Sequence, residues 1–144
     1  MLNIIKPKAV LASGDLTDGK TINLADSAQF QLEWETYERI IKGSSVLKNH
    51  TVWLDVRGNH DNFNVLNRNK PSNFFLKYGM KKLFDRSYIH HLNMPGGEKY
   101  SFIGVDACTE PGVKRPYNFF GNLDEVGKLT SFFKIEFLII KLFY

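Results

Sequence analysis

The 144-residue chain has little cysteine, no long apolar run and no repeats, and each of these absences excludes something. The one cysteine, Cys108, excludes an internal disulfide and leaves the cellular compartment open. A membrane-spanning helix needs about 20 apolar residues. The most apolar stretch, residues 132–144, is shorter and carries three charges. Lys6 interrupts the apolar start too early for a secretory signal. Because no internal repeat or low-complexity linker divides the chain, the sequence predicts a single domain.

The composition is that of a globular protein, with 43% apolar and 24% charged residues. The formal net charge of +4 is mild and spread along the chain. This charge favours a solvated face or attraction to anionic substrates over nucleic-acid binding. We expect no specific nucleic-acid partner.

Two apolar runs with a helical pattern between them predict a βαβ unit. Residues 9–13 and 51–56 are typical of buried strands. A helix is expected to start near Asp26, with Gln29 completing a capping box, and to end at Gly43. The crossover should be right-handed, which makes the two strands parallel. One helix face should pack on the sheet through Phe30, Trp34, Tyr37 and Ile41.

A polar segment follows each predicted strand. Residues 14–18 read Gly-Asp-Leu-Thr-Asp, and residues 57–61 read Arg-Gly-Asn-His-Asp. Parallel strands bring their carboxyl ends to one edge of a sheet, where ligands bind in open α/β folds. The two segments should therefore converge, although more than 40 positions separate them.

The side chains of these segments suit a metal-assisted hydrolytic site. The Asp15 carboxylate could bridge two cations, and the Asn59 amide could serve as a neutral ligand. His60 could ligate a metal or act as an acid, with Asp61 orienting its imidazole. Each motif taken alone also fits a simple turn or helix cap, and this holds most clearly for Asp18, which precedes Gly19.

The remainder of the chain predicts further short elements. A helix is expected over 71–78 and a hairpin of strands over 87–92 and 100–105, with Asp106 ending the second strand at a possible site edge. Residues 111–121 should form a loop. A weak helix is expected over 123–133 and a strand-like tail over 135–144. His90 and His91 should face opposite sides of a strand, and His50 should lie on the surface.

The two polar segments resemble motifs of the calcineurin-like metallophosphoesterases. The likeness is strongest over residues 7–124, whereas 125–144 form a divergent apolar tail. Residues 53–61, 105–107 and 111–121 are similar to a narrower group, in which the phosphoesterase domain precedes several membrane spans. The resemblance implies an α/β fold, namely a partial βαβ sandwich with α-β-β-α layers, truncated at both ends. On this basis residues 1–144 form a single partial domain.

The resemblance also implies roles for individual residues. Asp15 would bridge two divalent metals, among Mn, Fe and Zn, and Asn59 would ligate the second. His60 would stabilise the transition state or protonate the leaving group, with Asp61 holding it. Lys114 and Arg115 are candidate contacts for the anionic phosphoester substrate.

The family's initial Asp-x-His motif has no counterpart here, and no histidine follows His91. Because two ions need roughly eight ligand contacts, we expect this chain to be a fragment that is inactive alone and does not hold both metals. The alternative is a non-catalytic binding or interaction domain derived from a phosphoesterase. Full-length relatives should be membrane proteins, with membrane contact only through segments absent here.

Overall fold

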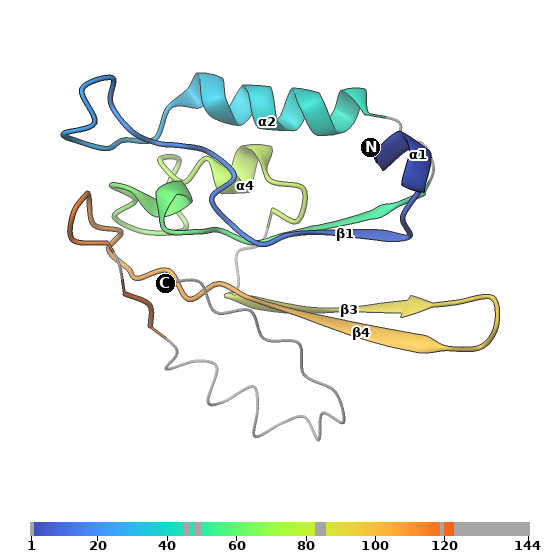
Figure 1. The fold of residues 1–144 in the computed structure, drawn as a ribbon. Coiled ribbons are helices and arrows are strands. Elements are labelled where there is room, and N and C mark those ends of the chain that lie inside the picture. Colours follow the sequence, from blue (N-terminus) through green and yellow to red (C-terminus); the bar gives the residue numbers. More distant parts are fainter. Residues whose placement is uncertain (1, 45–46, 48–49, 83–85, 119, 123–144) are drawn as a thin grey trace.

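The computed structural model describes residues 2–44, 47, 50–82, 86–118 and 120–122. Figure 1 shows their arrangement, with a helical layer above one small sheet and a hairpin below it. The elements in chain order are α1 (Leu2–Ile5), β1 (Ala9–Ala12), α2 (Gln31–Gly43), β2 (Val52–Asp55), the 3-10 helix η1 (His60–Asn62), α4 (Phe75–Tyr78), β3 (Ser87–Asn93) and β4 (Lys99–Val105).

Strands β1 and β2 confirm the predicted parallel pair. Ala9 lies opposite Val52, and Ala12 lies opposite Asp55. Helix α2 connects the strands and lies over the sheet (Figure 1). The carboxyl ends of both strands therefore open into the two polar segments at one end of the molecule.

The predicted capping box of α2 is wrong. The helix starts at Gln31, its N-cap is Phe30, and no side chain caps it. Gln29 instead uses its amide to reach a distant loop, because Nε2 donates to the carbonyl oxygens of His60 and Phe63 at 3.0 and 3.2 Å. Asp26 Oδ1 accepts the backbone N–H of Ser27 at 2.8 Å. Tertiary hydrogen bonds thus replace the local cap.

The core centres on α2 and α4. Trp34 is fully buried, and its ring meets those of Tyr37 and Phe75 edge-on, each with centroids 6.2 Å apart. Its indole N–H donates to Gln29 Oε1 at 2.9 Å, so the buried polar atom is satisfied. Phe75 and Tyr78 are also buried. Helix α4 ends at Tyr78 as expected, but it starts four residues later than predicted.

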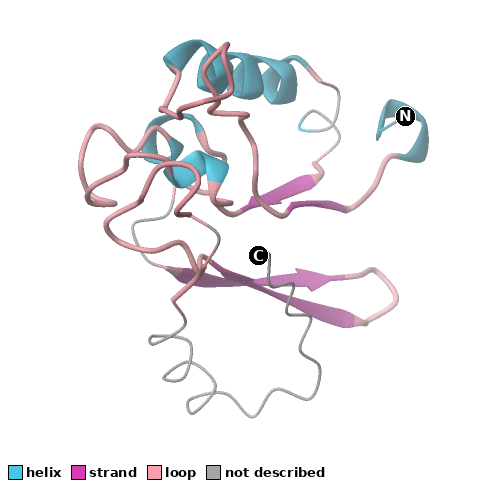
Figure 2. Cartoon of the chain, turned by 60° about the vertical axis from the view of Figure 1, so that its left-hand side comes forward, coloured by secondary structure: helices cyan, strands magenta, loops and turns pink. Residues whose placement is uncertain are grey.

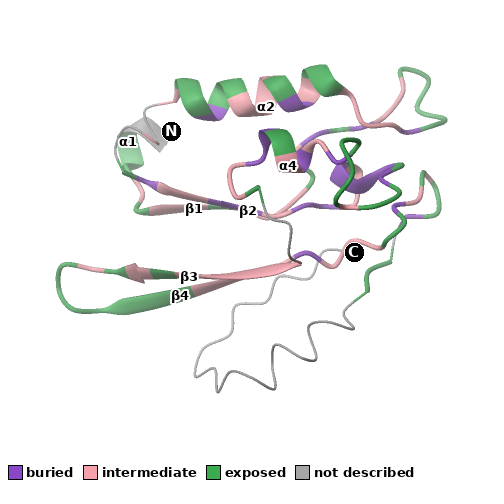
Figure 3. Cartoon of the chain, turned by 180° about the vertical axis from the view of Figure 1, so that it is seen from behind, coloured by how far each residue is buried: buried purple, intermediate pink, exposed green. Residues whose placement is uncertain are grey.

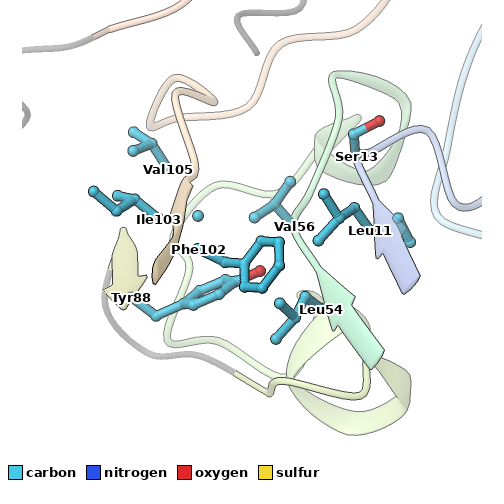
Figure 4. Close-up of a pocket in the computed structure, with 10 residues that line it drawn as sticks. Leu11, Ser13, Leu54, Val56, Tyr88, Phe102, Ile103 and Val105 are labelled. Atoms are coloured by element: carbon cyan, nitrogen blue, oxygen red, sulfur yellow. The ribbon is translucent and has the colours of Figure 1, made fainter. Parts of the chain in front are cut away.

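Strands β3 and β4 form the predicted hairpin as a separate antiparallel sheet, with Ser87 opposite Val105 and Asn93 opposite Lys99. Figure 2 shows the two sheets as distinct layers. Between them lies an apolar cavity of about 250 Å³ (Figure 4). Its lining includes Leu11, Leu54, Val56, Tyr88, Phe102 and Val105.

The described residues thus supply three of the expected layers, helix, sheet and sheet, and the α/β prediction is confirmed. The helix expected over 123–133 and the strand expected over 135–144 lie outside the described residues. Within the part of the chain that the structure describes, no helix is long and apolar enough to cross a bilayer.

Candidate active site at the edge of the parallel sheet

The two polar segments meet as predicted. The backbone N–H of His60 donates to Asp15 Oδ1 at 3.2 Å. Gly14 and Asp15 both adopt positive φ, +102° and +50°, which turns the chain sharply after β1. A Cβ on Gly58 would collide with the backbone nitrogen and carboxylate of Asp15, so only glycine allows this approach. The carboxylate of Asp15 thereby lies beside the Asn59-His60 segment.

Asp61 connects the two polar segments through its buried side chain. Its side chain is fully buried. Oδ2 accepts the backbone N–H groups of Leu16 and Gly58 at 3.0 and 2.8 Å, and Oδ1 accepts the N–H and hydroxyl of Thr17, both at 3.0 Å. Burial raises the pKa of Asp61 to about 6, against the opposing effect of these hydrogen bonds. The Asp61 carboxyl group thus ties the two loops together through hydrogen bonds, and we call this set of bonds the Asp61 clamp.

The expected contact between Asp61 and the His60 imidazole is therefore corrected. The Asp61 oxygens point to backbone donors, and the His60 Nδ1 lies 2.6 Å from the carbonyl oxygen of Asp18. A carbonyl oxygen only accepts, so Nδ1 carries a proton and Nε2 holds the lone pair in the neutral ring. Phe63 packs on the same ring, with centroids 4.9 Å apart.

Asp18 is consequently the residue that orients His60, a role that its position before Gly19 did not reveal. Its carboxylate lies 3.7 Å from His60 Nδ1 and pairs with Lys20 at 2.8 Å. The hydrogen bond from Lys20 lowers the pKa of Asp18, and the charge of Arg115 acts in the same direction.

A buried ion pair fixes the other side of the loop. Arg57 is 6% exposed, and its Nε and Nη2 lie 2.7 and 2.6 Å from Asp106 Oδ2. Its Nη1 donates to Asn62 Oδ1 at 3.1 Å. Asp106 Oδ1 accepts the backbone N–H of Cys108 at 2.9 Å. Asp106 thus lies at this edge of the sheet, where it pairs with Arg57.

The predicted substrate cations lie against the loop that precedes α2. Arg115 Nη1 donates to the Leu24 carbonyl oxygen at 3.1 Å, and its backbone N–H donates to Ser27 Oγ at 3.1 Å. Lys114 Nζ lies 3.7 Å from Asp26. The positive charge of Arg115 also contributes to the lowered pKa of Asp18, after the larger effect of Lys20.

The residues at this edge fit part of a two-metal centre and do not complete it. Asp15 offers a carboxylate and Asn59 an amide oxygen, both suited to hard divalent cations. Among the described residues, however, no group of three or more His, Cys, Asp or Glu side chains could hold a metal ion. His50, His90 and His91 do not join the site: His90 and His91 lie on β3, and His50 is exposed.

Comparisons with known proteins concern the sequence of the chain as a whole. A family model described as calcineurin-like phosphoesterase matches residues 1–140. The chain is 47% identical over 124 residues to transmembrane protein 62 of Mus musculus, covering 86% of this chain and 19% of that protein. It is 34% identical over 127 residues to a protein of Arabidopsis thaliana named "Putative metallophosphoesterase", covering 84% of this chain and 17% of that protein. The chain thus spans about a fifth of the length of the curated relatives it matches. No solved structure matches it.

Proposed function

Because the chain belongs to the calcineurin-like phosphoesterase family, we propose that its Asp15, Asn59 and His60 edge contributes to metal-dependent hydrolysis of phosphoester bonds. The observation that supports the proposal is the convergence of the two loops, with the His60 N–H on Asp15 Oδ1 at 3.2 Å. Family members generally bind two divalent metals, which supply charge neutralisation and an activated water when bound. Oxygen and imidazole donors suit Mn, Fe and Zn alike.

The chain's own contribution to chemistry is proton handling by His60. Its Nδ1 proton is held by the Asp18 carbonyl, and the Asp18 carboxylate lies nearby at 3.7 Å. This leaves Nε2 as the ring nitrogen available for proton transfer. Donation of a proton from Nε2 to the departing alkoxide, or stabilisation of charge on the phosphoryl oxygens, requires the imidazolium form, because Nε2 holds the lone pair in the neutral ring. We propose Arg115 as a contact for the anionic part of the substrate, because its charge already reaches Asp18.

The ligand count leads to a second part of the proposal. One carboxylate, one amide and one imidazole are too few for two ions, which need roughly eight contacts. The 144-residue chain alone should therefore bind metal weakly and turn over little substrate. The longer protein, in which further ligands join Asp15 and Asn59, should be the active form.

The test compares the 144-residue chain with the full-length protein, using bis-p-nitrophenyl phosphate and p-nitrophenyl phosphate with Mn²⁺ or Zn²⁺. We expect metal-dependent turnover from the full-length protein and loss of about 10²-fold or more in its Asp15→Asn variant. Unchanged turnover in that variant would remove Asp15 from the site. Two tightly held ions in the short chain would contradict the ligand count.

A binding domain without catalysis is the second candidate, and the same shortage of ligands favours it. On that proposal the chain would keep its fold without metal and bind an anionic partner through Lys114 and Arg115. A full-length protein that lacks turnover on both substrates, yet is monomeric and folded, would support this candidate over the enzyme.

The mouse relative is named a transmembrane protein. We propose that the longer protein containing this chain is likewise membrane-bound through other segments. Fractionation of cells that express the full-length protein tests this, because a protein recovered in the supernatant after high-speed centrifugation would contradict it.

A further inference from the structure

The loop between β1 and α2 is stiffened by its own hydrogen bonds. Lys20 and Ser27 form an isolated antiparallel bridge. Thr21 N–H donates to the Asp26 carbonyl at 3.1 Å, and Leu24 N–H donates to the Thr21 carbonyl at 2.8 Å. The side chains of Thr21 and Asn23 add further bonds within the loop. Residues 20–27, which we call the tip loop, therefore present their side chains in a fixed arrangement.

The tip loop exposes aliphatic side chains at its end. Ile22 is as exposed as in an extended chain, at 105%, and Leu24 is 62% exposed with φ of +58°. Positive φ is unusual for leucine, so the loop holds an apolar side chain in solvent at some conformational cost. Figure 1 shows the loop projecting from the body at the end that carries the site, and Figure 3 shows most of the projecting loop coloured as exposed.

Cations surround the base of the tip loop. The Arg115 guanidinium donates to the Leu24 carbonyl, Lys114 approaches Asp26, and Lys20 pairs with Asp18. The tip loop and the Lys114-Arg115 pair together carry three cations against one carboxylate, Asp26, whereas Asp18 and Glu33 beside the start of the loop bring the local balance to zero. Two exposed aromatic residues follow on the neighbouring loop, Tyr117 at 68% and Phe120 at 62%.

We infer that the tip loop and the basic pair Lys114-Arg115 form a contact for an anionic lipid bilayer. Aliphatic side chains inserted between headgroups, with cations at the level of the phosphates, are the arrangement by which peripheral proteins bind membranes. Protein interfaces bury their anchors in matching pockets, whereas Ile22 stands on a convex loop that a fluid lipid surface accepts without a preformed partner. The cations Lys20, Lys114 and Arg115 on this surface would favour anionic headgroups.

This contact has a consequence for the site. Lys20 begins the tip loop and pairs with Asp18, whose carbonyl oxygen meets the His60 imidazole. A bilayer seated on the loop would therefore lie close to the edge that carries Asp15 and His60. The inference differs from the sequence-based expectation that the membrane is reached only through other segments, and it does not depend on catalysis.

Binding of the 144-residue chain to sucrose-loaded vesicles tests the inference. Vesicles of phosphatidylcholine with 30% phosphatidylserine are compared with pure phosphatidylcholine, by sedimentation at low and high salt. We expect at least about fivefold stronger partitioning to the anionic vesicles, and weakening as salt is raised. Ile22→Ser with Leu24→Asn should lower partitioning by about tenfold, since asparagine keeps the positive φ while the apolar insertion is lost.

The control replaces two other exposed aliphatic residues, both on α2. Leu32 and Ile40 are 73% and 65% exposed. Leu32→Ser with Ile40→Ser should leave partitioning within about twofold of wild type. Equal losses in both double variants would show general stickiness and overturn the inference. Absence of binding to anionic vesicles would also overturn the inference. The tip loop would then be a candidate contact for a protein partner instead of a bilayer.

A labelled variant keeps the test informative if the double variant misfolds. Ile22→Cys in a Cys108→Ser background carries an environment-sensitive fluorophore on its thiol. Lipid insertion should shift the emission to shorter wavelength on anionic vesicles, whereas a label at Leu32→Cys in the same background should not respond. No shift at either position would contradict the proposed contact.

Discussion

The clamp at Asp61 gives the sharpest test of how the two site loops are held together. In Asp61→Asn, one carboxylate oxygen becomes an NH₂ donor. The least harmful orientation turns this NH₂ toward Thr17, whose hydroxyl can switch from donor to acceptor, while the other oxygen keeps the Leu16 and Gly58 N–H groups. The Thr17 N–H then loses its acceptor inside the protein. One unsatisfied buried donor costs about 1–3 kcal/mol.

Asp61→Leu should cost more, because all three backbone N–H groups lose their acceptor. We expect about 3–5 kcal/mol at pH 7. The assay is urea unfolding at constant protein concentration, followed by tryptophan fluorescence and far-UV circular dichroism. The exposed hairpin residue Glu98 provides the control, since Glu98→Gln should change the free energy of unfolding by less than about 0.5 kcal/mol.

A result in which Asp61→Asn is as stable as wild type, or more stable, would refute the reasoning. It would mean that the cost of burying the carboxylate outweighs its four hydrogen bonds, so that the neutral amide is the better residue. The Asp61→Leu variant separates this outcome from a general tolerance of the position, because leucine removes both the charge and the acceptors.

Four further predictions follow from the same contacts. Gly58→Ala should cost at least about 1–3 kcal/mol of stability and displace Asp15, which a loss of metal affinity in the full-length protein would reveal. Arg57→Met should cost about 1–3 kcal/mol by removing the two shortest contacts of the buried Asp106 carboxylate, which keeps the longer approach of Arg68 Nη2 at 3.8 Å, and adding Asp106→Leu should recover part of that loss in a double-mutant cycle. Because the folded-state pKa of Asp61, about 6, lies above its ordinary 3.8, the folded protein binds the extra proton. Stability should therefore fall by up to about 3 kcal/mol as pH rises from 4 through 6, and Asp61→Asn should abolish that slope. Addition of 1 mM Mn²⁺ to the 144-residue chain should raise the unfolding free energy by less than about 1 kcal/mol, and a rise above about 3 kcal/mol would reveal tight metal binding.

The parallel pair and the meeting of Asp15 with His60 could be predicted because few physical rules determine them. Two apolar runs joined by a helix must run parallel, and parallel strands share one carboxyl edge. Gly14, which follows β1, and Gly58, which precedes Asn59, marked the two points where the backbones of the two segments approach closely. The place where the two segments meet followed from topology, so its prediction did not require knowledge of side-chain packing.

The partners of individual polar groups could not be predicted in the same way. Asp61 stands next to His60 in the sequence, which suggested a contact, but its carboxylate turns to backbone donors 44 and 45 positions away. Arg57 pairs with Asp106 across 49 positions. Gln29 fits a capping box by spacing, yet the carbonyl oxygens near η1 compete successfully for its amide. Long-range hydrogen bonds leave no periodicity in a sequence.

These contacts also explain how an edge with few metal ligands can keep its shape. The 57–62 loop is held by the Arg57–Asp106 ion pair, by the Asp61 clamp and by the close approach at Gly58. None of the three uses the Oδ2 atom of Asp15, the Asn59 amide or the His60 Nε2. The atoms that we propose for metal or substrate are thus separate from the atoms that stabilise the loop. The geometry at this edge is therefore set by the protein's own contacts, which is the preorganisation that the proposed hydrolysis would require.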